Sequence, residues 1–209
     1  MDGAALLDSV RTGTETELDR LGSEKSLLAA TEARLEPDSV LVTAAATLRT
    51  ARDTTAEWAE AATDEAAADA LETTAHTFGE GFDRVTAELE GDGEDVAALD
   101  APFLALDAEG DIERLAAGTI GVALVLDRLL LQGVSFFVNE ADSPRADLFR
   151  DLRGDTDAVL ATGQSALDDC CTGEDWDRAE TAATAVIAAA YDDYVDRLEA
   201  MGFDPKPIC

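Results

Sequence analysis

The chain has 209 residues, with 46 Asp and Glu against 15 Lys and Arg, which gives a formal net charge of −31 at pH 7. So few cations argue against direct nucleic-acid binding, because contacts to phosphate need lysine or arginine. Apolar residues still make up 46% of the chain, so its acidity is not the low-hydrophobicity signature of disorder, and its length allows a substantial core.

Acidic residues are spread over every segment rather than gathered in one tail. Such a surface repels itself at low ionic strength, whereas molar salt, in which the Debye length falls to about 3 Å, screens the repulsion. We therefore expect a protein suited to a salt-rich cell interior, as in halophilic archaea. The N-terminal MDGAALLDSVRTGTE is acidic and has no long apolar run, which predicts neither a signal peptide nor a membrane anchor, and hence a cytoplasmic protein.

The first elements along the chain are short N-terminal helices. Residues 4–21 carry a discontinuous apolar face and are predicted to form one helix that ends at Gly22, as helices often end at glycine. Ser23 can cap a second helix that extends to about Ala33.

Two long amphipathic stretches follow and predict an antiparallel hairpin. The first, residues 37–62, begins at Glu36–Pro37–Asp38, with proline at the first turn. Its apolar positions have helical spacing, with Thr55 as the one polar interruption; they are Leu41, Ala44, Ala45, Leu48, Ala51, Trp58 and Ala62. The second, residues 64–90, presents Leu71, Ala75, Phe78, Phe82, Val85 and Leu89.

Residues 91–110 form the one long irregular stretch, which fits a crossover from one end of a bundle to the other. A helix is predicted from residues 111 to 142, about 45–50 Å long, and it contains the most apolar run, Ile120–Val138. A membrane span is disfavoured because Asp127 and Arg128 would each cost roughly 2.5–3.5 kcal/mol at mid-membrane. We interpret this helix as the centre of a soluble bundle.

The remaining chain predicts two more helices. Asp142–Ser143–Pro144 is a stop and restart signal with a serine cap, followed by a helix over residues 144–171. Thr172–Asp175 resembles a capping box and starts a helix that ends at Gly202, before an extended tail over residues 203–209. No segment alternates with period two, so we predict an all-α chain forming one bundle domain, with residues 1–35 as N-terminal helices.

The sequence contains three cysteines, which are Cys170, Cys171 and Cys209. Adjacent cysteines on a helix point about 100° apart and pair poorly, and Cys209 lies beyond a long helix that runs away from them. We therefore expect reduced thiols, as is usual in the cytosol, and keep a redox or metal role for Cys170 and Cys171 as an alternative.

The central helix carries one polar feature besides packing residues. Arg128, Gln132, Ser135, Asn139 and Asp142 follow i, i+4, i+7, i+11 and i+14, which places them in one stripe. The simpler interpretation is a strip that faces water or a polar seam against a neighbouring helix. The functional interpretation is the wall of a cleft or partner groove, with Arg128 recognising an anion, so Arg128, Gln132, Ser135 and Asn139 are the candidate binding residues.

Two ion pairs are also expected near this stripe. Asp127 points about 100° away from Arg128 and is predicted to pair with an arginine of another helix. Glu140 and Arg145 are predicted to pair across the Ser143–Pro144 turn.

Two hairpins separated by a long connection, with extra helices at both ends, is the organisation of the ferritin-like superfamily. The segment Val134–Cys209, with FFVNEADSPRADLFRDLR and YDDYVDRLEAMGFDPKPIC, resembles haloarchaeal rubrerythrin-like proteins. The resemblance implies a ferritin-like antiparallel helical bundle. In that family, inward carboxylates from four helices, two of them carrying Glu-x-x-His, hold two irons.

The iron-binding set of that family is missing from this chain. His76 is the one histidine, so two Glu-x-x-His motifs are impossible, and Glu72 precedes it by four residues instead of three. His76 should point away from the core, while Phe78 and Phe82, with Leu48 and Trp58 on the partner helix, occupy the depth where ligands would lie. We therefore predict no metal ligands, no cofactor and no catalytic residues.

Three functions remain open at this stage. The first is a ferritin-like bundle that has lost its metal centre and acts as a binding or assembly module, with a protein partner or through self-association. The second is a rubrerythrin-type peroxidase or oxidase with an atypical carboxylate metal site. The third is an all-helical chaperone for a redox enzyme. Nucleotide-binding glycine loops, a nucleophile elbow and Cys-x-x-Cys are absent from the sequence.

Overall fold

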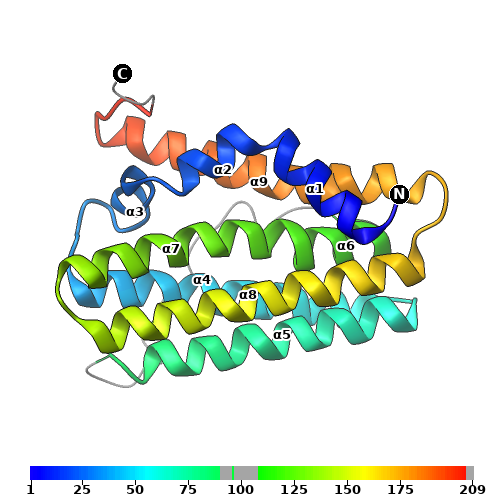
Figure 1. Ribbon diagram of the computed structural model, residues 1–209, viewed down its shortest axis with the longest axis horizontal. Coiled ribbons are helices and arrows are strands. Elements are labelled where there is room, and N and C mark those ends of the chain that lie inside the picture. Colours follow the sequence, from blue (N-terminus) through cyan, green and yellow to red (C-terminus); the bar gives the residue numbers. More distant parts are fainter. Residues whose placement is uncertain (90–95, 97–107, 206–209) are drawn as a thin grey trace.

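A computed structural model describes residues 1–89, 96 and 108–205. Every regular element in these residues is a helix and none is a strand, which confirms the all-α class. The long helices lie nearly parallel or antiparallel to one another, and the N-terminal helices lie with the last helix on one side of the molecule (Figure 1).

The first hairpin consists of α4 (Pro37–Ala61) and α5 (Glu65–Thr86), which pack along their full length. Asp64 caps α5, because its carboxylate accepts a hydrogen bond from the Ala67 N–H at 3.0 Å. The predicted start and end of α4 agree with the structure to within one residue. The end of α5 does not: the helix stops at Thr86 rather than near residue 90.

The second hairpin pairs the central helical segment with α8 (Ser143–Cys170). The predicted serine cap is wrong. Asp142 caps α8, because its carboxylate accepts from the Arg145 N–H at 3.2 Å, and the chain reverses through Ala141 at a φ of 58°. The predicted stop and restart is therefore present, with the aspartate in place of the serine.

The central segment is not the single α-helix that the sequence predicts. It consists of α6 (Asp111–Ala116), a π-helical turn η3 (Ala117–Gly121) and α7 (Val122–Asn139). The helix α9 (Asp175–Ala200) packs against this turn: a side chain at Gly121 would place its Cβ 2.7 Å from that of Val186 and 2.8 Å from the Ala183 carbonyl oxygen. Glycine is thus required where the two backbones meet.

The second hairpin begins at the end of the molecule where the first one turns. Asp111, at the start of α6, accepts hydrogen bonds from the backbone of Thr63 and Asp64 at 2.9 and 2.8 Å. The end of α5 and the start of α6 therefore lie at opposite ends of the bundle, and α5 and α7 run in the same direction (Figure 1). The predicted connection, residues 91–110, lies mostly outside the described residues.

An outer layer covers the second hairpin. It contains α9 (Asp175–Ala200) with α1 (Gly3–Gly13), α2 (Glu15–Leu21) and α3 (Glu24–Ala30) alongside it (Figure 1). The single helix predicted for residues 4–21 is broken at Thr14, whose hydroxyl donates to the Val10 carbonyl at 2.7 Å. The helix predicted to reach Ala33 ends at Ala30.

The core is continuous between the layers. Its largest fully buried side chains include Phe78, Phe137 and Phe149. Phe82, predicted to be buried, is only half-buried, and the Arg52 guanidinium lies 5.3 Å from its ring centroid. By length and composition the segment from α6 to α7 would be able to span a membrane, but 61% of its most apolar 18-residue window is buried inside the molecule.

Candidate functional site

The interior of the two-hairpin bundle is filled by apolar side chains. Phe78 of α5 is 2% exposed, and Leu48 and Trp58 of α4 are also buried. Thr55, the polar interruption on α4, is buried too, and its hydroxyl donates to the Ala51 carbonyl of its own helix at 2.8 Å. The side-chain oxygen at these positions is therefore the Thr55 hydroxyl, which is hydrogen-bonded within its own helix.

The one histidine lies on the outer surface. The His76 side chain is 73% exposed, and its Nδ1 is 3.7 Å from the Glu80 carboxylate one helical turn later. Among residues 1–89, 96 and 108–205, no three or more His, Cys, Asp or Glu side chains are grouped so that they could hold a metal ion. The expected orientation of His76, away from the core, is confirmed.

The predicted polar stripe of α7 is divided by the fold. Gln132 is buried, and its side-chain amide donates to the Gly22 carbonyl at the end of α2. Ser135 and Asn139 are exposed, and the Ser135 hydroxyl donates to the Leu131 carbonyl of its own helix. Gln132 therefore belongs to a seam that attaches the N-terminal helices, whereas Ser135 and Asn139 face water.

Arg128 is the stripe residue that reaches a hollow of the surface. Its Cδ lies against Gly22, its Nε is buried without a hydrogen-bond partner, and its Nη1 is 3.9 Å from the Asp127 carboxylate. The hollow lies between α7 and the first two helices, and its other lining residues are Arg11, Thr12, Glu15, Leu18 and Asp19. Carboxylates from α2 thus line the same hollow as the two arginines.

Asp127 pairs with an arginine of another helix, as predicted: its carboxylate accepts from the Arg153 Nε of α8 at 2.8 Å. The predicted pairing of Glu140 with Arg145 is wrong. Arg145 lies instead 3.5 Å from the carboxylates of Asp142 and Glu88. Glu140 follows the last residue of α7 and is exposed.

A mainly apolar pocket lies where the N-terminal helices, the first hairpin, the central helix and α9 meet. Its cavity volume is about 70 Å³, and the pocket is partly open to the surface. The lining residues come from five helices, and they are Leu21, Ser26, Ala29, Ala30, Thr43, Thr47, Val125, Leu126, Leu129, Ala190, Asp193, Tyr194 and Arg197. Many of these side chains are small, which leaves space between helices that are otherwise closely packed.

The polar groups of this pocket are few. Asp193 and Arg197 form an ion pair at 2.8 Å, and the Thr43 and Thr47 hydroxyls donate to carbonyls of their own helix. Ser26 and Tyr194 are 8% and 4% exposed, yet neither hydroxyl is hydrogen-bonded to any residue in the described part of the chain. Concave, mainly apolar pockets with a few placed polar groups are typical of small-molecule sites.

The C-terminal end of α9 is attached beside this pocket through cations. The Arg20 guanidinium donates to the Tyr191 hydroxyl at 3.1 Å and to the Pro205 carbonyl at 3.4 Å. The Lys25 ammonium donates to the Asp204 carbonyl at 2.8 Å. These contacts draw the segment after α9 against α2 and α3, where Arg20, Lys25 and Pro205 line a second hollow that Tyr194 also borders.

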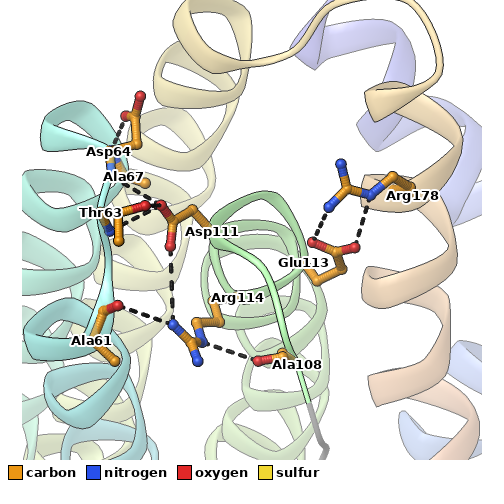
Figure 2. A network of polar contacts seen from close by, with 9 residues as sticks. All are labelled: Ala61, Thr63, Asp64, Ala67, Ala108, Asp111, Glu113, Arg114 and Arg178. Carbon is orange, nitrogen blue, oxygen red and sulfur yellow. Dashed lines mark hydrogen bonds and ion pairs between the residues drawn. The ribbon is translucent and has the colours of Figure 1, made fainter.

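At the opposite end of the molecule, a polar network connects the ends of four helices (Figure 2). Asp111 is its centre: one carboxylate oxygen accepts from the Thr63 N–H, the Thr63 hydroxyl and the Asp64 N–H, at 2.7 to 2.9 Å. Partial burial acts to raise the pKa of Asp111, but these hydrogen bonds outweigh it and leave the pKa below its ordinary value.

Arginines complete this network. Arg114 donates to the Ala108 carbonyl at 2.9 Å and to the Ala61 carbonyl at the end of α4 at 3.2 Å. Arg178 of α9 binds Glu113 of α6 with two parallel hydrogen bonds, at 2.8 and 2.9 Å (Figure 2), and the pKa of Arg178 is raised, chiefly by Glu113. Such bidentate pairs are the stronger kind of ion pair.

The start of α9 and the cysteines lie at this same end. The predicted capping box at Thr172 is wrong, because Glu174 is the residue before α9 and no side chain caps the helix. The Thr172 N–H instead donates to the Asp175 carboxylate at 3.0 Å. Cys170 and Cys171 are free thiols. Burial, together with a hydrogen bond from the Cys170 thiol to Asp64, raises its pKa to about 12, and burial raises that of Cys171 to about 11. Both are therefore protonated and weakly nucleophilic at neutral pH.

Comparison of the chain with protein-family models, with curated proteins and with solved structures finds no match. The pocket and the polar network are the two sites that the sequence alone did not indicate. Neither has a local motif: the pocket is formed by small side chains from five helices, and Asp111 meets residues 47 and 48 positions earlier.

Proposed function

We propose that this protein is a ferritin-like helical bundle without a diiron centre, and that it binds a small, mainly apolar molecule in the pocket beside Tyr194. The ferritin-like part is supported by two helical hairpins, of which the first ends and the second begins at opposite ends of the bundle (Figure 1). The apolar interior around Phe78 and Trp58 supports the absence of iron, because these side chains occupy the volume that the metal would need.

The observation that carries the binding role is the pocket itself. Ala29 and Ala190 lie on facing helices where larger side chains would close the space. Atoms that line an unfilled space lose the dispersion contacts that close packing supplies. A bound apolar molecule would restore those contacts and would be stabilised by leaving water.

We also propose that the protein works in a salt-rich cytoplasm. The supporting observation is a net charge of −31 on a chain of 22.0 kDa. Such a charge favours a monodisperse soluble protein and disfavours polyanionic partners such as nucleic acids.

The test of the binding role is a pair of matched substitutions on α9. Ala190→Leu places a larger side chain in the pocket, whereas Ala188→Leu places the same side chain on the exposed face. With toluene as the probe and NMR titration in molar KCl as the measurement, Ala190→Leu should weaken binding roughly tenfold or more, since overpacking of this size costs about 1–3 kcal/mol. Ala188→Leu should bind like the natural protein.

Equal toluene binding by Ala190→Leu and the natural protein, or no binding by either, would refute the pocket as the site. Elemental analysis of protein purified from a salt-rich host tests the metal part. Stoichiometric iron would favour the oxidoreductase with an atypical carboxylate site, and a redox enzyme that co-purifies with the chain would favour the chaperone.

A further inference from the structure

Two hydroxyl groups in the pocket lack partners in a molecule that otherwise satisfies its buried hydroxyls. Ser26 comes from α3 and Tyr194 from α9, and both residues are more than nine-tenths buried. By contrast, the buried hydroxyls of Thr43, Thr47 and Thr55 each donate to a backbone carbonyl. Neither oxygen is enclosed, because the fully buried side-chain atoms without a partner in the described residues are the Nε atoms of Arg84 and Arg128. The hydroxyls of Ser26 and Tyr194 are therefore open to a hydrogen bond from a bound molecule or from water.

The charges at the pocket indicate a neutral occupant. Among the described residues, Asp193 and Arg197 are the charged residues that line it, and they bind each other at 2.8 Å. A carboxylate or an ammonium in the pocket would have to break this pair or remain uncompensated in a mainly apolar space, which is unfavourable. A neutral oxygen meets neither difficulty.

We infer that the ligand of this pocket is a small neutral molecule with an apolar body and one hydrogen-bonding oxygen, such as a phenol, an alcohol or a ketone. Its oxygen is bound by the hydroxyls of Ser26 and Tyr194, and its body lies against Val125, Leu126 and Leu129 of α7. This inference rests on the proposed function, since it names the class of molecule that the same pocket binds.

The experiment compares toluene with phenol, which has nearly the same shape and replaces the methyl group by a hydroxyl. Both dissociation constants are measured by NMR titration in molar KCl for the natural protein and for Tyr194→Phe. We expect Tyr194→Phe to weaken phenol binding roughly five- to tenfold, the effect of one hydrogen bond, and to leave toluene binding within about twofold. Ser26→Ala should act in the same direction.

The matched control is Tyr191→Phe, the same substitution three residues earlier on α9. Tyr191 accepts a hydrogen bond from Arg20 and does not line the pocket, so its variant should bind phenol and toluene like the natural protein. Melting temperature separates binding from folding: Tyr194→Phe removes an unpaired hydroxyl and should be as stable as the natural protein.

The possible failures are distinguishable. If the natural protein binds neither toluene nor phenol, the proposed function is wrong. If toluene binds but Tyr194→Phe and Ser26→Ala leave the ratio of phenol to toluene affinity unchanged, the pocket is a binding site whose hydroxyls are satisfied by water, and the inference on ligand class is overturned. A loss of phenol affinity that is equal in Tyr191→Phe and Tyr194→Phe overturns it as well.

Discussion

The two ends of the bundle differ in what fills them. Where α4 turns into α5, charged side chains bind one another and nearby backbone groups and so connect the ends of four helices. Where α3 meets α9, mainly apolar side chains surround open space. Asp111 alone receives three hydrogen bonds at the first end. At the second end, the hydroxyls of Ser26 and Tyr194 receive none from the described residues. We refer to them as the closed end and the open end.

The two ends use their cations in similar ways and differ in how closely their side chains pack. At the closed end, Arg178 binds Glu113 and Asp175, and Arg114 donates to backbone carbonyls. At the open end, Arg197 binds Asp193, and Arg20 donates to the carbonyl of Pro205. Ligand sites often come from the less stable parts of a fold, and the open end, where space remains between the helices, is where we propose binding.

The largest expected effect is that of salt. Lowering KCl from molar to roughly 0.1 M lengthens the Debye length to about 10 Å, and the melting temperature should fall steeply because the negative charges of the surface repel one another. Hydrogen exchange should show α3 and the last turns of α9 opening before the α4–α5 turn, where opposite charges attract more strongly at low salt. A flat melting profile, or opening at the α4–α5 turn first, would contradict this account.

Removing the centre of the closed end should have the next largest effect. Asp111→Ala is expected to lower the free energy of unfolding by about 2–3 kcal/mol, since the side chain is only 16% exposed and its charged hydrogen bonds are lost. Urea unfolding in molar KCl measures the change. The control is Asp147→Ala on α8, whose exposed carboxylate binds only Arg150 one turn later; it should cost less than about 0.5 kcal/mol.

The pH dependence of Asp111→Asn provides a smaller and more specific test. The pKa of Asp111 is lowered in the folded protein, so its carboxylate stabilises the fold above the unfolded-state pKa of about 3.9. That contribution is lost as pH falls through the lower folded-state pKa. The stability difference between the natural protein and Asp111→Asn should therefore be constant near neutral pH and shrink below about pH 4. A difference that stays constant down to pH 2 would show that the charge of Asp111 is unimportant.

The smallest effects are expected on the central helix, between the two ends. Gln132→Leu leaves the Gly22 carbonyl without its side-chain donor and should cost about 1–2 kcal/mol. Arg128→Leu should change stability by less than about 1 kcal/mol, because its side chain is 30% exposed and its nearest carboxylate, on Asp127, already binds Arg153. Thermal unfolding of both variants in the same buffer tests the order.

Arg128→Leu also tests the predicted recognition role of the stripe. If the variant keeps its stability but loses an anion or protein that co-purifies with the natural chain, the functional interpretation of Arg128 gains support. A loss of several kcal/mol would instead place Arg128 in the packing of α2 against α7.

Most of the helix ends were predictable from sequence because they depend on neighbouring residues. Pro37 at the start of α4 and Gly22 after α2 act within one turn of the chain. The cap of α8 was mispredicted because aspartate and serine are both good capping residues, and Asp142 and Ser143 are adjacent. In the structure the chain turns at Ala141, and the Asp142 carboxylate is the one that accepts a hydrogen bond from the start of α8. The break at Thr14 directly follows Gly13, a local signal that the prediction of one helix over residues 4–21 passed over.

The candidate sites were harder to predict because their members are distant in sequence. Nothing in the spacing around Ser26 and Tyr194 indicates that they line one pocket. The hydrogen bond from the Gln132 side chain to the Gly22 carbonyl likewise joins residues that are 110 positions apart in the sequence. The sequence spacing correctly placed the polar stripe on one face of α7, but it does not predict which other helix packs against that face. Here α2 covers Gln132 and leaves Ser135 and Asn139 in water.

The π-helical turn η3 has a consequence for insertions and deletions in this chain. Because a π turn holds one more residue than the α turn that would replace it, deleting one residue from Ala117–Gly121 could restore a regular α-helix. Such a deletion would leave α6 and α7 nearly in their present phase, because one helical turn replaces another. If all the residues of η3 instead adopted the α conformation, every residue of α6 would rotate by about 100° relative to α7 and shift by about 1.5 Å. Asp111 would then turn away from Thr63, and Arg114 from Ala61, so the π turn absorbs one residue and keeps the two halves of the central helix in phase with their different partners.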